Sequence, residues 1–446
     1  MFMASLNSSN HDQQEEDPGT DLQYNHQIIP EPSREGFISA VSNATHMRQL
    51  LTRCAELISR SDFSAAHRLV SILSGNSSPY GDSVERLVHQ FAKALSLRLK
   101  NCCYAAAAAA TTTTSAASAS IIMASTPTTA AATALSNDRN NVDMTEPEEH
   151  LQSCYLSLNQ ITPFVRFSHL TANQAILEAI DEGQKAIHIL DFDIMNGLQW
   201  PPLMQALAER SYPPPMLRIT ATGHDLNILH KTGDRLLKFA QSLGLRFQFH
   251  PLLLFGNSND VPAFPPALAL LPEEALAVNC VLYLHRLLRD DSRGLRLFLH
   301  KIKALNPKVV TIAEREANHN HPLFMQRFVE ALDHYTAVFD SLEATLPPNS
   351  RERVTVEQVW FGREIMDIVA AEGNNRRERH ERYESWEVML RSSGFSNVPL
   401  SPFALSQAKL LLRLHYPSEG YQLQIRNDSL FLGWRNRALF SVSSWQ

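Results

Sequence analysis

Glycine is scarce in this sequence: it occurs 16 times in 446 residues, and no two glycines lie within three positions of each other. Nucleotide-binding loops need closely spaced glycines, because only then can backbone N–H groups approach a phosphate. The sequence therefore contains neither a G-x-G loop nor a P-loop. It also lacks a serine in a G-x-S-x-G motif, so it offers no recognisable nucleophile for covalent catalysis.

Cysteine is also rare. The five cysteines are an odd number and show no paired metal-ligand spacing, which favours free thiols in a reducing compartment. A secretory signal is not visible, because the N-terminus is polar and becomes acidic from Asp12 to Asp17. We therefore expect the protein to stay inside the cell.

Long apolar runs are missing too. The longest uncharged stretch, Asn101 to Asn137, consists mainly of alanine, threonine and serine. These residues contribute little insertion energy, so a disordered linker is favoured over a membrane span. We expect a low-complexity insert over residues 101–147 and no membrane association.

Excess positive charge is absent: the net charge is −6 and the pI is near 6.3, which argues against a broad face that coats nucleic acid. The densest basic cluster is Arg376, Arg377, Arg379 and Arg382. Glutamates interleave with these arginines, which is typical of a solvated helical face with ion pairs. Direct contact with phosphate is the alternative for this candidate basic patch.

The chain is long enough to bury a large core, and the spacing of apolar residues in its first half predicts helices. Residues 1–42 are polar and are predicted to be a disordered tail. Residues 43–180 are predicted to form a helical cap that includes the insert, and Asp82 with Glu85 is a capping signal for its third helix. The leucines at helical spacing favour a core, with a partner surface as the alternative. The first helix carries Met47, Leu50, Leu51, Cys54, Leu57 and Ile58.

Residues 181–446 alternate between short apolar runs and amphipathic stretches, which predicts a doubly wound, mostly parallel sheet. The first strand ends at Asp191 in KAIHILDFDIMNGLQWPPL, and Pro201 can start the next helix. A later helix is expected to begin at Thr232 and to end at Gly244. Alternation around Asn427-Asp428 predicts an antiparallel C-terminal hairpin. Further strands are expected at Leu217–Ala221, Leu245–His250, Ala275–Leu282 and Val309–Ala313.

This architecture resembles S-adenosylmethionine-dependent methyltransferases, so such an enzyme, or a small-molecule-binding protein, is the alternative function. Asp191 and Asp193 could hold a ligand amine at the carboxyl edge of the sheet, although helix capping or a turn is the favoured role. The cofactor glycines are missing, and Asp225 is the nearest carboxylate after the second strand. We therefore predict no catalytic or cofactor-binding residues.

Two other motifs have plain structural explanations. His319 and His321, with Glu314 and Glu316, lack the helical HExxH geometry, so we expect polar residues of a turn and helix start, and no metal site. Leu284, Leu287 and Leu288 match an LxxLL pattern that can enter a partner groove as a helical stripe. Burial of these leucines beside the predicted strand is the favoured interpretation.

The C-terminal tryptophans are predicted to be structural. Leu430, Leu432 and Trp434 alternate on one face of a strand, and Leu439 to Trp445 can supply the next strand. The rings of Trp434 and Trp445 are therefore expected to cover the apolar surface of the sheet.

Several stretches, in the same order, resemble the plant GRAS family of transcriptional regulators. Ile187, His188, Ile189, Leu190 and Asp191 are similar to its VHIID motif. Together the matching stretches cover nearly everything after residue 42, and they most resemble the Lateral suppressor branch of Scarecrow-like proteins. The others are the leucine-rich stretch from Met47, PFVRFSHLTANQAILEA from Pro163, REANHN from Arg315, FDSLEA from Phe339, REI from Arg363, RRERHE from Arg376 and the closing LFLGWRNRALFSVSSWQ.

The resemblance implies a nuclear regulator of plant development, acting for example in axillary meristem initiation, whose methyltransferase-like core is a scaffold without a cofactor. It implies binding to other GRAS proteins, as homo- or heterodimers, and to zinc-finger transcription factors, with DNA contacted indirectly or weakly. The family's terminal Ser-Ala-Trp appears here as Ser443-Ser444-Trp445. The N-terminus lacks the DELLA-type hormone-response sequence, so direct control by a gibberellin receptor is not implied.

Overall fold

The computed structural model describes residues 34–117, 148–210, 213–253, 270–347 and 349–446. The chain divides into two compact units, residues 1–44 and residues 45–446. Of the first unit, only the start of α1 (Arg34–Ser59) is described. All other elements belong to the second unit, and none of the described helices is both long and apolar enough to span a membrane.

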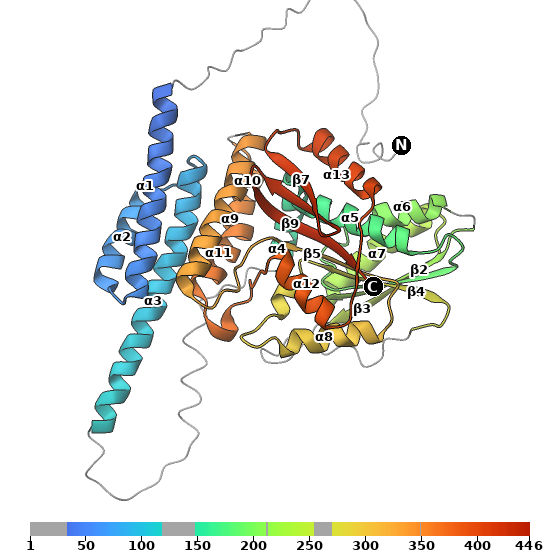
Figure 1. Cartoon of the computed structure of the whole chain (residues 1–446), viewed down its shortest axis with the longest axis horizontal. Helices are drawn as coiled ribbons and strands as arrows, with labels where there is room; N and C mark the ends of the chain where they lie inside the picture. Colours follow the sequence, from blue (N-terminus) through green and yellow to red (C-terminus); the bar gives the residue numbers. More distant parts are fainter. Residues whose placement is uncertain (1–33, 118–147, 211–212, 254–269, 348) are drawn as a thin grey trace, which may run out of the picture. The chain divides into compact units, whose positions relative to one another are not determined.

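The described strands of the second unit form one sheet in the order β3-β2-β1-β4-β5-β9-β8-β7, with the short β6 paired to β9 (Figure 1). The first five are parallel, and β9, β8 and β7 are antiparallel to their neighbours. The predicted strands and fold class are thus confirmed. The bounds are β1 (Ala186–Asp191), β2 (Met216–Gly223), β3 (Phe247–Leu253), β4 (Glu274–Val281), β5 (Val309–Arg315), β6 (Asn397–Val398), β7 (Tyr421–Arg426), β8 (Ser429–Trp434) and β9 (Arg437–Trp445).

Helices cover both faces of the parallel strands, because successive side chains of a strand point to opposite faces. Ile187 and Ile189 of β1 pack with α6 (Trp200–Arg210) and α7 (Leu226–Ser242). Leu190, which follows Ile189 and points to the opposite face, packs in a different cluster with α8 (Arg293–Ala304) and α12 (Tyr383–Ser392), which lie together below the sheet in Figure 1. The VHIID-like stretch therefore supplies both layers of the core.

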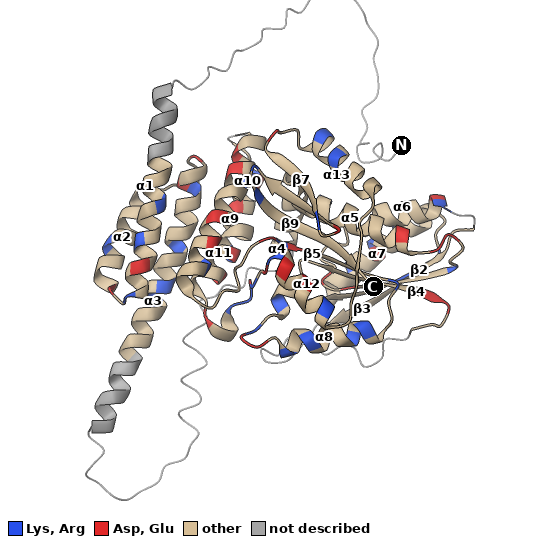
Figure 2. Ribbon diagram, viewed as in Figure 1, with Lys and Arg blue, Asp and Glu red and all other residues tan. Residues whose placement is uncertain are grey.

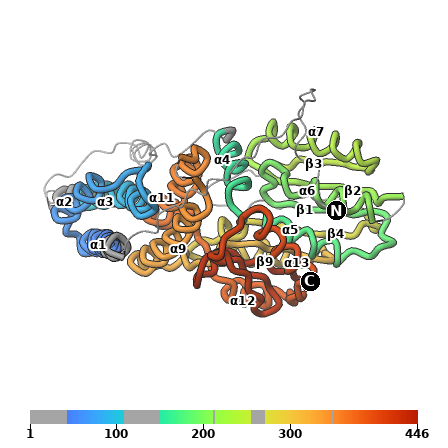
Figure 3. Tube along the Cα trace, turned by 90° about the horizontal axis from the view of Figure 1, so that it is seen from above, coloured from blue at the N-terminus to red at the C-terminus, as the bar shows by residue number. Residues whose placement is uncertain are grey.

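A helical group lies beside the sheet and combines both halves of the chain. Figure 3 shows α3 next to α9 and α11, and the ring of Phe91 in α3 lies edge-on to Phe328 of α9, with 5.6 Å between centroids. α5 instead packs on β5 and β9. Helices from before and after residue 180 therefore pack together in this group. The helices are α2 (Phe63–Gly75), α3 (Ser83–Ala117), α4 (Glu148–Ile161), α5 (Pro163–Ala179), α9 (Phe324–Thr345), α10 (Arg351–Thr355), α11 (Gly362–Ala370) and α13 (Pro402–His415).

Two predicted disordered stretches are partly helical. α1 begins at Arg34, before the expected boundary at residue 42. The sequence permits this early start, because no proline occurs between Pro32 and the end of the helix. α3 continues through the alanine run to Ala117, although the linker was expected to begin at Asn101. Alanine has the highest helix propensity, so the run prolongs the helix without needing burial. The rest of these stretches, residues 1–33 and 118–147, lies outside the described residues.

Two of three local sequence signals, for two helix caps and one hairpin turn, predicted the observed structure. Asp82 Oδ1 accepts from the N–H of Glu85 at 2.9 Å and caps α3 as predicted. Thr232 was the wrong cap for α7: it is buried inside the helix, and Asp225 accepts the N–H groups of the first turn at 2.7 and 3.0 Å. Asn427 and Asp428 adopt positive φ in the tight turn between β7 and β8, so the predicted hairpin is confirmed.

Candidate functional site

The order of the strands reverses between β1 and β4, and open α/β sheets bind their ligands at such a switch point. Asp191 ends β1, and Asn279 of β4 lies beside it in register. Trp200 opens α6, and Gln199 precedes it. Because all four residues are buried, the place where a cofactor would lie is occupied by the protein's own polar side chains.

These side chains form a continuous hydrogen-bonded set with Thr311 of β5, which we call the amide network: Asp191, Gln199, Trp200, Asn279 and Thr311. Asp191 accepts from Trp200 Nε1 and from Asn279 Nδ2, each at 2.8 Å. Asn279 Oδ1 accepts from Gln199 Nε2 at 3.0 Å and from the Thr311 hydroxyl at 2.9 Å. Asp191 therefore holds side chains together, and the expectation that it caps a helix or forms a turn was wrong.

Burial raises the pKa of Asp191 to about 7, even though its bonds to Asn279 and Trp200 act in the opposite direction. Desolvation disfavours the ionised form and outweighs the two donors. A carboxyl group with this pKa could serve in acid–base chemistry. Here both of its oxygens are occupied by side chains of the chain itself, so it has no free oxygen for a substrate.

The loop after β1 is held by contacts within the chain. Asp193 has a φ of 65°, its N–H donates to the Thr222 hydroxyl at 2.8 Å, and its carboxylate pairs with Arg286. The turn expected at Asp193 is thus confirmed. Phe192 stacks on Tyr283, with 5.2 Å between ring centroids.

His188 of the VHIID-like motif is buried between strands. Its Nε2 lies 2.8 Å from the Thr220 hydroxyl, and its Nδ1 lies 3.2 Å from a guanidinium nitrogen of Arg218, which also pairs with Glu274. Burial, assisted by Arg218, lowers the pKa of His188 to about 4. The imidazole is therefore neutral at pH 7 and links β1 to β2.

The LxxLL leucines form part of the core. Leu284, Leu287 and Leu288 lie in a short 3-10 turn after β4 and are 0%, 8% and 3% exposed. They pack with α8, so they cannot enter a partner groove in this structure. Burial, the favoured interpretation, is what the structure shows.

The candidate basic patch is neither a solvated helical face nor a phosphate site as a whole. Residues 376–382 are not helical, and Arg376 and Arg379 are buried. Arg379 donates to Asp290 at 2.8 Å and to carbonyl groups, while Arg377 and Arg382 remain exposed. Alternating charges resemble a helical face, but Arg379 is held by Asp290 and Asn320 from distant segments together with two nearby carbonyl groups. Lysine and arginine residues also lie along α8 (Figure 2), where Arg293, Arg296 and Lys301 are exposed.

Both C-terminal tryptophans are buried, as predicted, but they lie in different clusters. Trp434 packs edge-on to Tyr421, at 4.8 Å between centroids, and its Nε1 donates to Asp340 at 2.7 Å. Trp445 is 0% exposed and belongs to the cluster of α8 and α12. Each ring therefore covers a different side of the sheet.

The four residues weighed as a metal site are not brought together. His321 Nδ1 accepts from the N–H of Leu323 ahead of α9, which confirms its helix-start role. Glu316 accepts from the N–H of Tyr383 at 3.1 Å. His319 is fully buried and is therefore not an ordinary polar turn residue.

The structure assembles a different set, which we call the histidine–glutamate cluster: His285, Glu314, Glu378 and His380. Glu314 is the penultimate residue of β5, His285 follows β4, and the other two lie in the segment before α12. All four are buried. Sequence analysis missed the set because its members are up to 95 positions apart; the only local signal is the E-x-H spacing inside RRERHE.

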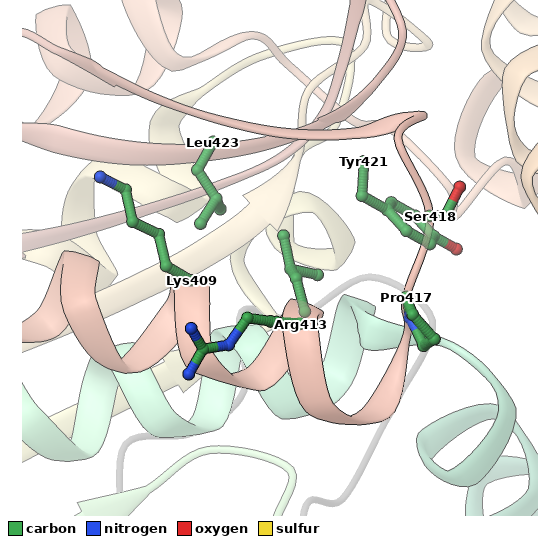
Figure 4. A pocket seen from close by; sticks show the side chains of 7 residues that line it. Lys409, Arg413, Pro417, Ser418, Tyr421 and Leu423 are labelled. Atoms are coloured by element: carbon green, nitrogen blue, oxygen red, sulfur yellow. The ribbon is translucent and has the colours of Figure 1, made fainter.

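A shallow groove of about 440 Å³ lies between α13 and β7 (Figure 4). Lys409 and Arg413 reach it from α13, and Tyr421 and Leu423 from β7. Its lining residues include no acidic, histidine or cysteine side chain, so they supply neither an acid–base pair nor a metal-ligand set.

Comparison with known proteins gives consistent matches. The model of the GRAS domain family matches residues 47–446. Scarecrow-like protein 18 of Arabidopsis thaliana is 55% identical over 90% of this chain and 91% of its own length. Protein MONOCULM 1 of Oryza sativa subsp. japonica is 43% identical over 90% of this chain and 88% of its own. The crystal structure of SCL7 in Oryza sativa is 33% identical, with a TM-score of 0.70, and covers 90% of this chain and 99% of that one.

Proposed function

The chain belongs to the GRAS domain family of plant transcriptional regulators, and we propose that its α/β core acts as a protein-binding scaffold and not as an enzyme. The observation that carries this proposal is the amide network. It fills the switch point with buried side chains that satisfy one another's hydrogen bonds, so ligand entry there would leave several polar groups without partners.

The surroundings of the network support the same conclusion. A methyltransferase-like site needs a glycine-rich approach to the cofactor, and the loop after β1 contains only Gly197 between Asp191 and Pro201. The acidic residue that could hold a ribose after β2 is Asp225, and its carboxylate is used to cap α7. Each group that could contact a cofactor thus has a structural role.

By family membership, the protein acts in the nucleus and regulates development, for example the initiation of axillary meristems. Its partners are other GRAS proteins, as homo- or heterodimers, and zinc-finger transcription factors, so DNA is contacted mainly through them. The net charge of −6 supports indirect contact, because the chain has no overall electrostatic attraction for DNA.

Isothermal titration calorimetry with S-adenosylmethionine tests the scaffold proposal. We expect no binding at micromolar concentrations, with a known methyltransferase as the positive control for the ligand. Micromolar binding that is lost in Asp191→Ala, or methyl transfer that depends on Asp191, would favour the enzyme.

Recovery of partners from plant nuclei tests the regulatory function. We expect the intact chain to capture GRAS and zinc-finger proteins, and to shift DNA only when these partners are added back. Tight, sequence-specific DNA binding by the purified chain alone would contradict indirect contact.

A further inference from the structure

Three ligand atoms of the histidine–glutamate cluster converge in the interior. Nε2 of His285 lies 3.2 Å from Oε2 of Glu378, and Nε2 of His380 lies 3.4 Å from the same oxygen. One ligand atom from each of His285, Glu378 and His380 lies within 4.8 Å of the other two. Both histidines are at least nine-tenths buried, and apart from these approaches to Glu378 neither Nε2 has a hydrogen-bond partner among the described residues. Two buried nitrogens that share a single carboxylate oxygen need an explanation.

The hydrogen bonds behind the two rings prepare the nitrogens for a cation. His285 Nδ1 donates to Glu314 Oε2 at 2.7 Å, so the neutral tautomer leaves a lone pair on Nε2. His380 Nδ1 lies 3.0 Å from Nδ1 of His319, and donation by His380 leaves a lone pair on its Nε2 as well. A carboxylate behind a histidine is the arrangement that orients metal-binding imidazoles.

The segment that carries Glu378 and His380 is held by its backbone. The N–H of Glu378 donates to Asp367 Oδ1 at 2.8 Å, and the carbonyl oxygen of His380 accepts from the N–H groups of His319 and Asn320 at 2.9 and 3.1 Å. The nearby guanidinium group of Arg286 is already paired with Asp193. The cluster is therefore preorganised, and the carboxylates of Glu314 and Glu378 give it negative charge.

We propose that His285, Glu378 and His380 bind one divalent transition-metal ion, with Glu314 as the residue that orients His285. In tetrahedral zinc sites the ligand atoms lie about 2.0 to 2.1 Å from the metal, which places them about 3.3 Å from one another. The two measured separations of 3.2 and 3.4 Å match that value.

The donor set selects the class of ion. Two imidazole nitrogens and one carboxylate suit zinc and its transition-metal neighbours, whereas calcium and magnesium prefer oxygen ligands only. The bound ion would join the turn after β4 to the segment before α12.

The test uses the full chain produced in zinc-supplemented medium and desalted, with metal content measured by mass spectrometry. We expect about one transition-metal ion per chain. Because the site is buried, the chain is also unfolded with chelator and refolded with zinc or with cobalt. Refolding with cobalt should produce the intense visible absorption of a tetrahedral ion.

Glu378→Gln and His380→Asn should each abolish binding, while His300→Gln, at an exposed histidine of α8, should retain it. Circular dichroism checks that each variant is folded, and the cobalt spectrum of the unmodified chain gives a result even if the variants misfold. A metal content far below one per chain after both production and refolding, or a metal that remains in Glu378→Gln and His380→Asn, overturns the proposal.

Discussion

The amide network and the histidine–glutamate cluster are both buried at the carboxyl ends of parallel strands of the same sheet, but they differ in how far their hydrogen bonds are satisfied. In the amide network every buried side-chain donor and acceptor has a partner within the chain. In the histidine–glutamate cluster two ring nitrogens approach the same carboxylate oxygen and make no other hydrogen bond within the described part of the chain. The comparison shows that burial alone does not identify a functional site. Unsatisfied polar atoms distinguish a position that is closed from one that can accept a ligand.

The largest effect is expected from Asn279→Leu, which removes the centre of the amide network. Asp191, Gln199 and Thr311 would each lose a partner, and several buried polar groups that lose a hydrogen bond together should cost about 3 to 5 kcal/mol. Urea unfolding monitored by circular dichroism measures the loss. Thr311→Val, which removes only one donor, is the control and should cost about 1 kcal/mol. Equal effects of the two changes would mean that the network is not cooperative.

Stability measured as a function of pH tests the amide network through Asp191, its ionisable residue. Asp191 has a pKa of about 7 in the folded chain and about 3.9 when unfolded, so the folded state binds the extra proton between these values. Its contribution to stability is therefore present below pH 4 and is lost as the pH rises to 7.

Asp191→Asn cannot titrate, so the free energy of unfolding of the variant should improve relative to the parent over this window. The expected relative change is about 2 to 4 kcal/mol, whatever the absolute offset between the two proteins. Urea unfolding at intervals from pH 4 to pH 8 measures it. Parallel stability curves would show that Asp191 is ionised throughout.

A smaller effect is expected at the support of the histidine–glutamate cluster. Arg379 is 1% exposed and donates to Asn320, Asp290 and carbonyl groups, which anchors the segment of Glu378 and His380. Lysine cannot reproduce this forked geometry, so Arg379→Lys should cost about 1 to 2 kcal/mol and weaken metal binding. Thermal unfolding with and without zinc tests both effects. A variant that retains parental stability and zinc affinity would remove Arg379 from this role.

The smallest effect is expected from Arg377→Ala, two positions away. Its side chain is exposed, and only its backbone N–H contacts Asp367, so the melting temperature should not change. Differential scanning calorimetry measures the melting temperatures of Arg377→Ala and Arg379→Lys side by side. The two variants are a matched pair, because both change an arginine in the same arginine-rich segment. A clear drop for Arg377→Ala would place its guanidinium in an unrecognised contact.

Local pattern was sufficient where a structure depends on neighbouring residues. The apolar run before Asp191, the capping pair Asp82 and Glu85, and the turn at Asn427 and Asp428 each specify an element within a few positions, and all three are confirmed. Asp225 and Thr232 can both cap a helix, and the sequence pattern led to the wrong one as the start of α7. Charge alternation around Arg379 was misleading for another reason, because its side-chain acceptors Asn320 and Asp290 are distant in sequence.

The sequence by itself determined the family, the strands along the chain with their C-terminal hairpin, and the absence of a glycine-rich nucleotide loop. Only the tertiary structure decided which polar residues meet. Asp191 and Asn279 are 88 positions apart, and they pair because adjacent parallel strands bring them into register. His285 meets Glu378 because two connecting segments close over the same edge of the sheet. Hydrophobic periodicity depends on local geometry, whereas a buried polar partner is selected by the packing of the whole core.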